Sequence, residues 1–268
     1  MIPAGFAYER AGSLDEAVEL LGSEDAKVLS GGQSLIPLLR LRFVRPSVLV
    51  DIGRLDDLRY VREDGDRIAI GALMRHSDLM ADQVLGAGCA VIPHAAEYVG
   101  DPQVRHRGTI GGSIAHADPA SDLSTILLTL DADLVARGPD GERTIPAADF
   151  FVGPFTTALG PRDVLREIRV PKVESGVYLK HNRRSQDWAT VGAAAAKVDG
   201  GVKVGLASMG GTPLRARGVE EALADGASPA DAAERVAEGT QPPADIGGSS
   251  EYRAHLAQVL VRRALEQL

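Results

Sequence analysis

Short apolar runs that end at a glycine, a proline or a polar turn recur through the first part of the chain, and they predict strands alternating with helices. Strands are predicted over residues 6–10, 26–30 and 47–52, and helices over 14–22 and 34–42. Ser13 and Glu16 form a capping box for the first helix, and Ser34 is a candidate N-cap of the second. Residues 1 to about 55 are therefore expected to form a compact β-α-β-α-β unit.

The next part of the chain changes to paired alternating segments around turn residues, which is typical of antiparallel hairpins. Hairpins are predicted over 60–70, around Asp64-Gly65-Asp66, and over 134–145, around Pro139-Asp140-Gly141, with a further strand over 164–170. Helices are predicted over 77–82, capped by Ser77, over 92–99, and from Asp122 onward. A boundary is expected between Pro171 and Gly176, because proline closes the last of these strands.

The segment after this boundary predicts a smaller α+β unit. Three antiparallel strands are expected over 176–181, 190–198 and 202–209, with Gly200-Gly201 as the tight turn between the second and the third. Helices are expected over 216–224, 229–237 and 250–268, the last capped by Ser249 or Ser250.

Composition and charge narrow the classes of function. With 268 residues, 44% hydrophobic residues and 25% charged residues, the chain has the make-up of a soluble globular protein. A formal net charge of −8 gives no general attraction for nucleic acid. Cys89 is the single cysteine, which excludes an intrachain disulfide and an iron–sulfur cluster held by this chain alone. No signal peptide or membrane-spanning run is found, so the cytoplasm is the expected compartment.

Two diglycine segments are candidates for binding a ligand: Ser30-Gly31-Gly32-Gln33-Ser34 and Thr109-Ile110-Gly111-Gly112-Ser113. Backbone N–H groups exposed by glycines can surround a phosphate, and two such segments suit a diphosphate. The spacing matches neither a Rossmann fingerprint nor a Walker A loop. From the residues alone, two ordinary turns and a nucleotide site both remain open. No acid–base or nucleophile constellation and no metal-ligand spacing is visible.

Four separated stretches carry a family resemblance, and they lie at residues 26–37, 108–122, 165–171 and 178–190. In order and spacing they resemble the FAD-binding medium subunit of the molybdenum hydroxylases, the carbon monoxide dehydrogenase and xanthine dehydrogenase family. Three positions depart mildly from the family pattern: Ser30, where alanine is common, Ser113, where asparagine is frequent, and Trp188, where tyrosine is common.

The resemblance implies an α+β fold of the vanillyl-alcohol-oxidase-like (PCMH-type) class. It has an FAD-binding domain over 1–173, made of two α/β subdomains (about 1–55 and 56–173), and a small C-terminal α+β domain over 174–268. It also implies a set of residues that bind FAD: Val28, Leu29, Ser30, Gly31, Gly32, Gln33, Ser34, Leu35, Thr109, Ile110, Gly111, Gly112, Ser113, Asp122, Leu165, Lys180 and Trp188. Trp188 would lie close to the isoalloxazine ring. The residues alone allow plainer roles: Asp122 as a helix N-cap, Lys180 as a solvated surface residue, and Trp188 as a core or interface anchor.

The function implied by the resemblance is electron transfer within a molybdenum-containing hydroxylase or dehydrogenase. Electrons would pass from [2Fe-2S] clusters of a small partner subunit, via FAD, to an external acceptor. A large partner subunit would hold molybdopterin, and the whole would be a dimer of heterotrimers. The alternatives are a stand-alone flavoprotein oxidase of the same fold superfamily and a scaffold that has lost FAD. The substrate and the final acceptor cannot be predicted from this chain.

Overall fold

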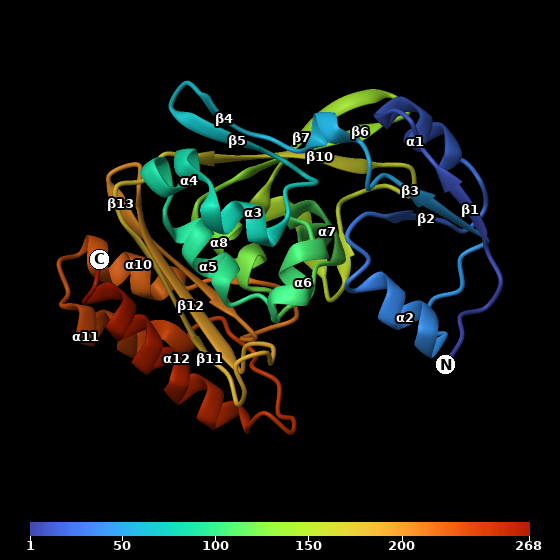
Figure 1. The fold of residues 1–268 in the computed structure, drawn as a ribbon. Coiled ribbons are helices and arrows are strands. Elements are labelled where there is room, and N and C mark those ends of the chain that lie inside the picture. Colours follow the sequence, from blue (N-terminus) through green and yellow to red (C-terminus); the bar gives the residue numbers. More distant parts are fainter.

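The computed structural model describes residues 1–268, and three successive parts of the chain each build a β-sheet (Figure 1). The first sheet contains β1 (Ala7–Arg10), β2 (Ala26–Leu29) and β3 (Val48–Asp51) in the order β1-β3-β2, with both pairings parallel. Helices α1 (Leu14–Leu20) and α2 (Leu35–Leu41) connect these strands. Parallel strands place their carboxyl ends at the same edge of the sheet, so the segments after β2 and β3 lie close together.

The second sheet is antiparallel and forms the centre of the molecule. Its order is β4 (Val61–Asp64), β5 (Arg67–Gly71), β10 (Val164–Pro171), β6 (Asp133–Gly138) and β7 (Gly141–Pro146). Six helices follow β5: α3 (His76–Ala81), α4 (Gln83–Gly88), α5 (Val91–Glu97), α6 (Pro102–Arg107), α7 (Ile110–His116) and α8 (Asp122–Thr129). The largest hydrophobic core forms between this sheet and the helices, and α8 is buried along its whole length. A short helix, α9 (Ala147–Phe150), and the small pair β8 (Phe151–Gly153) and β9 (Thr156–Thr157) close this part.

The third sheet is covered on both faces. Its strands are β11 (Gly176–His181), β12 (Val191–Val198), β13 (Gly201–Ala207) and β14 (Leu214–Arg215), in that order. Side chains alternate along β12, so Ala194, Ala196 and Val198 join the central core. Val191, Ala193 and Ala195 point the other way, toward α10 (Arg217–Ala224), α11 (Pro229–Ala233) and α12 (Ser250–Leu265). The central core and the C-terminal sheet therefore share one apolar interface.

Most expected strands and long helices are present, and the errors concern caps and short helices. The second diglycine segment is not a loop, because Gly111 and Gly112 lie in the first turn of α7. Helices α4 and α6 were also missed, since α4 contains Gly86 and Gly88 and α6 has Val104 as its one aliphatic residue, so neither shows an apolar helical period. The tight turn is Asp199-Gly200, both with positive φ, and Gly201 already belongs to β13.

Three predicted caps are wrong. The Ser34 side chain makes no capping hydrogen bond, and Ser77 lies inside α3, which begins one residue earlier. Ser121 caps α8 by accepting from the N–H of Ser124, so Asp122 is the first residue of that helix and not its cap. The predicted caps Ser13 and Ser249 are confirmed, each accepting from the backbone N–H three residues later.

Candidate FAD-binding site

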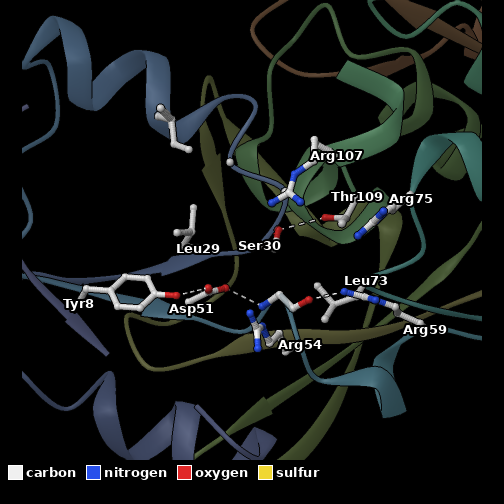
Figure 2. A pocket seen from close by; sticks show the side chains of 14 residues that line it. Tyr8, Leu29, Ser30, Asp51, Arg54, Arg59, Leu73, Arg75, Arg107 and Thr109 are labelled. Atoms are coloured by element: carbon white, nitrogen blue, oxygen red, sulfur yellow. Dashed lines mark hydrogen bonds between the residues drawn. The ribbon is translucent and has the colours of Figure 1, made fainter. Parts of the chain in front are cut away.

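A cavity of about 410 Å³ lies between the first sheet and the start of α7 (Figure 2). Fourteen residues form its wall: Tyr8, Leu29, Ser30, Gly31, Gly32, Ile36, Asp51, Gly53, Arg54, Arg59, Leu73, Arg75, Arg107 and Thr109. Ten of the fourteen are not hydrophobic, so this cavity suits a polar ligand.

The first glycine segment approaches the second part of the chain very closely. A Cβ at Gly31 would overlap the carbonyl oxygen of Arg107 and lie 2.8 Å from the Cα of Gly108. Gly32 has φ of +75°, in the left-handed region that side chains disfavour. Glycine at these two positions therefore lets the end of β2 pass against the segment that leads into α7.

The second glycine segment begins α7, with Thr109 as its N-cap. The Thr109 hydroxyl accepts from the N–H of Gly112 at 3.1 Å, and it lies 3.0 Å from the Ser30 hydroxyl. A Cβ at Gly112 would fall 2.8 Å from that same Ser30 oxygen. The hydrogen bond between Ser30 and Thr109 thus joins two segments that are 79 residues apart in the sequence, and Figure 2 shows it as a dashed line.

Four arginines surround the cavity, and sequence reasoning missed all of them. They come from different elements: Arg54 follows β3, Arg59 ends a short 3-10 helix (Asp56–Leu58), Arg75 precedes α3, and Arg107 ends α6. Arg59 donates to the carbonyl of Gly53 and pairs with Asp56 at 3.1 Å. The other three make no ion pair with any carboxylate of the chain, so their positive charge is available to an anion.

The floor of the cavity contains one carboxylate, Asp51, at the end of β3. One of its oxygens accepts from the Tyr8 hydroxyl at 2.5 Å, and the other accepts from the N–H of Gly53 at 2.7 Å. The hydrogen bond to Asp51 raises the pKa of Tyr8. Both contacts fix the orientation of the Asp51 carboxylate and leave further lone pairs free to accept hydrogen bonds.

A second polar cluster, away from the cavity, joins α8 to the C-terminal sheet. Asp122 accepts from the Tyr178 hydroxyl at 2.5 Å and from the Lys180 ammonium at 2.9 Å. Lys180 also donates to the carbonyl of Tyr98 at 3.1 Å. The side chains of Lys180 and Asp122 are only 2% and 6% exposed, so the charges compensate each other inside the protein.

Burial is the main cause of the shifted pKa values in this second cluster. It raises the pKa of Asp122 even though Lys180 and Tyr178 oppose that rise, and burial together with the Asp122 charge raises the pKa of Tyr178. Helix α7 links the cluster to the cavity, since Ser113, four residues after Thr109, lies 3.4 Å from the Ser121 hydroxyl that caps α8.

The structure brings only part of the predicted set to the cavity wall. Leu29, Ser30, Gly31, Gly32 and Thr109 line it. The other predicted residues are not part of this wall. Val28 lies in β2, Gln33 and Ser34 end the first glycine segment, and Leu35 begins α2. Ile110, Gly111, Gly112 and Ser113 lie in α7, Asp122 and Lys180 pair with each other, Leu165 is buried in the central core, and Trp188 is 61% exposed.

The missed arginines could not have been chosen from the sequence alone. Arginine is common on protein surfaces, and nothing in the local pattern marks Arg75 or Arg107 among the other arginines of this chain. The one usable signal is position, because Arg54 lies just after the parallel strand β3, where ligand-binding residues gather.

Comparison with known proteins shows which family this chain belongs to. Two family models match the chain: "FAD binding domain in molybdopterin dehydrogenase" over residues 4–173 and "CO dehydrogenase flavoprotein C-terminal domain" over residues 176–268. This chain belongs to the family of FAD-binding medium subunits of the molybdenum hydroxylases. It is therefore an oxidoreductase subunit with an FAD-binding domain of the PCMH-type fold.

Relatives cover the whole chain. It is 38% identical to the carbon monoxide dehydrogenase medium chain of Hydrogenophaga pseudoflava, covering 99% of this chain and 97% of that one. It is 37% identical to the glyceraldehyde dehydrogenase medium chain of Sulfolobus acidocaldarius, with complete coverage of both. A solved carbon monoxide dehydrogenase from Hydrogenophaga pseudoflava superposes with a TM-score of 0.95 at 39% identity, covering 100% of this chain and 98% of that chain. No helix is long and apolar enough to cross a membrane.

The residues of the cavity fit the charged half of FAD. Gly31 and Gly32 contribute main chain without a side chain to the cavity wall, and three arginines without carboxylate partners can neutralise a diphosphate. Asp51 is placed to accept hydrogen bonds from hydroxyl groups, as a ribose offers. The cavity thus combines donors for phosphate with an acceptor for sugar.

Proposed function

We propose that this chain is the electron-transfer subunit of a molybdenum-containing hydroxylase or dehydrogenase complex, acting between [2Fe-2S] clusters of a partner subunit and an external acceptor. Bound FAD supplies the exchange between one-electron and two-electron transfer, and the protein supplies binding and orientation. The observation that carries the proposal is the junction at Ser30 and Thr109, where two glycine segments and three unpaired arginines surround one cavity.

The partners in this proposal are a large molybdopterin-binding subunit and a small [2Fe-2S] subunit, in a dimer of heterotrimers. Names of relatives support such an assembly, among them the 6-hydroxypseudooxynicotine dehydrogenase complex subunit alpha of Paenarthrobacter nicotinovorans, 38% identical over 99% of this chain. The division into an FAD-binding unit over 1–173 and a C-terminal unit over 174–268 belongs to the same proposal, and the bounds of the two matching family models support it.

We propose that Gly31, Gly32 and Thr109 hold the diphosphate together with Arg75 and Arg107. Asp122 and Lys180 then serve the site indirectly, because each already uses its charge on the other. Their buried pair fixes α8 and β11, and through Ser121 and Ser113 it fixes α7. Trp188, with its exposed ring, remains the proposed neighbour of the isoalloxazine.

The test is flavin retention by glycine variants of the full chain. Gly32→Asp adds a carboxylate to the cavity wall, where we expect phosphate, and Gly112→Asp forces a side chain against the Ser30 and Thr109 hydroxyls. Both purified variants should therefore lose bound FAD, measured from absorption after reconstitution. Matched controls are Gly65→Asp, which has a similar positive φ at an open hairpin tip, and Gly86→Asp, which lies on a helix with nothing nearby. Controls that retain flavin while both site variants lose it would support the proposal; full retention by all four would contradict it.

The alternative is a stand-alone flavoprotein oxidase. Wild-type protein loaded with FAD should not be reduced rapidly by alcohols, aldehydes, amines or sugars when its partners are absent. Rapid reduction by one of these compounds, followed spectroscopically in a stopped-flow instrument, would favour the oxidase and overturn the subunit proposal.

A further inference from the structure

The segment between β11 and β12, residues 182–190, carries Trp188, the one tryptophan of the chain, and we call it the Trp188 connection. Residues 183–186 are exposed, and so is the Trp188 ring. The next two residues, Ala189 and Thr190, are only 4% and 6% exposed. Because an exposed ring makes few packing contacts, its position depends on the main chain that carries it. The point where this main chain enters the protein therefore decides where the ring lies.

Two buried side chains from distant elements hold this entry point. The Ser208 hydroxyl, just after β13, donates to the carbonyl of Ala189 at 2.7 Å. The Arg253 guanidinium, on α12, donates to the carbonyl of Thr190. The N–H of Thr190 in turn donates to the carbonyl of His181, at the end of β11, at 2.8 Å. Three separate segments thus fix the two residues at the entry point.

Arg253 is a buried cation that serves two acceptors at once. Besides the Thr190 carbonyl, its guanidinium pairs with the Asp245 carboxylate at 2.6 Å, whereas its buried Nε has no hydrogen-bond partner. An unsatisfied buried donor lowers stability. The planar guanidinium can nevertheless join a carbonyl and a carboxylate in one fixed geometry, which the single ammonium of lysine does less well. Arg253 therefore ties the entry point to the loop that precedes α12.

Ser208 holds an unusual main-chain conformation. Its φ is +61°, in a region that residues other than glycine seldom adopt. Such a conformation persists only where the surrounding structure enforces it. The Ser208 N–H donates to the carbonyl of Pro119 at 3.0 Å, in the segment between α7 and α8. Because the N-cap of α7 is Thr109 on the cavity wall, Ser208 links the Trp188 connection to the helix that contains the second glycine segment.

We propose that Ser208 and Arg253 are positioning residues that fix Trp188 relative to the FAD site; this inference rests on the proposed function. A flavin that exchanges electrons with other molecules has to stay accessible, so burial cannot be what fixes an aromatic ring beside it. Attachment of the main chain next to Trp188 fixes the ring and leaves it exposed. Neither Ser208 nor Arg253 lines the cavity, so both act through Trp188.

Trp188 can report its own motion, because no other tryptophan contributes to the emission. Time-resolved fluorescence anisotropy of the full chain, before FAD is added, compares wild type with Ser208→Gly and Arg253→Met. Glycine keeps the left-handed main chain and removes only the hydroxyl. In both variants the amplitude of nanosecond motion should rise about twofold or more. Asp199→Gly, at an exposed left-handed residue, and Arg263→Met, at an exposed arginine of α12, are matched controls and should follow wild type.

Flavin emission after reconstitution with FAD gives the second measurement. Ser208→Gly and Arg253→Met should emit more strongly than wild type, as Trp188→Phe should, because a mobile ring quenches the flavin less. Wild-type anisotropy in both variants would overturn the inference and leave the proposed function intact; a loss of unfolding free energy alone would then show a merely structural role. Equal flavin emission from wild type and Trp188→Phe would instead overturn the proposed place of Trp188 beside the isoalloxazine, whatever the anisotropy.

Discussion

The two polar clusters of this protein use charge in opposite ways. Around the cavity, Arg54, Arg75 and Arg107 lie in partly or fully exposed positions without carboxylate partners. Between α8 and β11, Asp122 and Lys180 are buried and neutralise each other. A charge left unpaired at an accessible site has low cost in water and is free for a ligand, whereas a buried charge is tolerated only with its partner. The first cluster should therefore control binding, and the second should control folding.

Removal of the buried cation should give the largest effect. Lys180→Met leaves Asp122 buried without its partner, so the free energy of unfolding should fall by about 3 kcal/mol or more near pH 8. Without Lys180 the pKa of Asp122 rises further, and the protonated acid tolerates burial. The deficit should therefore shrink as the pH is lowered and grow as the pH rises through that raised pKa.

Urea unfolding of Lys180→Met at pH 8 and at pH 5 measures both effects. Lys197→Met, at an exposed and unpaired lysine on the neighbouring β12, is the control and should change stability by less than about 0.5 kcal/mol. Equal free energies of unfolding for Lys180→Met and Lys197→Met would contradict the conclusion that the buried cluster controls folding.

His76 is a further buried titratable group whose charge state should affect folding. Burial, helped by the nearby Arg105 charge, lowers the pKa of His76 to about 4, and its Nδ1 has no hydrogen-bond partner. The folded protein thus prefers neutral His76, while the unfolded chain takes up a proton below about pH 6.5. This contribution to stability is complete above that pH and should be lost as the pH falls toward 4, by up to about 3 kcal/mol.

Comparison of wild type with His76→Gln over pH 4–7.5, by urea unfolding, isolates the contribution of this histidine. The variant should show a shallower loss of stability with acid, whereas His255→Gln, at an exposed histidine, should follow wild type. An identical acid slope for His76→Gln and wild type would contradict the prediction.

Arginine variants at the cavity should change binding and not folding. Arg107→Ala or Arg75→Ala removes a charged donor to the proposed diphosphate, and such hydrogen bonds contribute about 1.5–3 kcal/mol. FAD affinity should thus fall roughly 10- to 100-fold, measured by fluorescence titration, while unfolding free energy changes by less than about 0.5 kcal/mol. Arg263→Ala, at an exposed arginine of α12, is the control. If these variants lost unfolding free energy and kept their affinity for FAD, the arginines would serve folding, like Asp122 and Lys180, and not binding.

The smallest effect is expected at Trp188. Its ring is 61% exposed, so Trp188→Phe should change the unfolding free energy by less than about 0.5 kcal/mol. A ring close to the isoalloxazine quenches flavin fluorescence, and the variant should therefore fluoresce more strongly when loaded with FAD. Unchanged fluorescence would argue against its proposed position.

Local sequence signals predicted the regular elements well. Alternation and turn residues predicted the two hairpins of the central sheet and the three antiparallel strands β11, β12 and β13, because side-chain period and turn chemistry are local properties. The capping box at Ser13 is equally local, although Glu16 reaches back to the N–H of Gly12 and not to that of Ser13. Helices α4, α6 and α7 were not predicted, because their segments contain two glycines or only one aliphatic residue and so show no apolar helical period.

The sequence by itself determined that two diglycine segments exist, and the family resemblance connected them to FAD. Only the tertiary structure decided that Ser30 contacts Thr109 and that four arginines from separate parts of the chain surround one cavity. It also decided that Asp122 and Lys180 form a buried ion pair. The physical reason is the distance along the chain over which each kind of interaction acts. Backbone conformation and periodicity act over a few residues, whereas the meeting of charges depends on chain segments brought together by burial of the shared core.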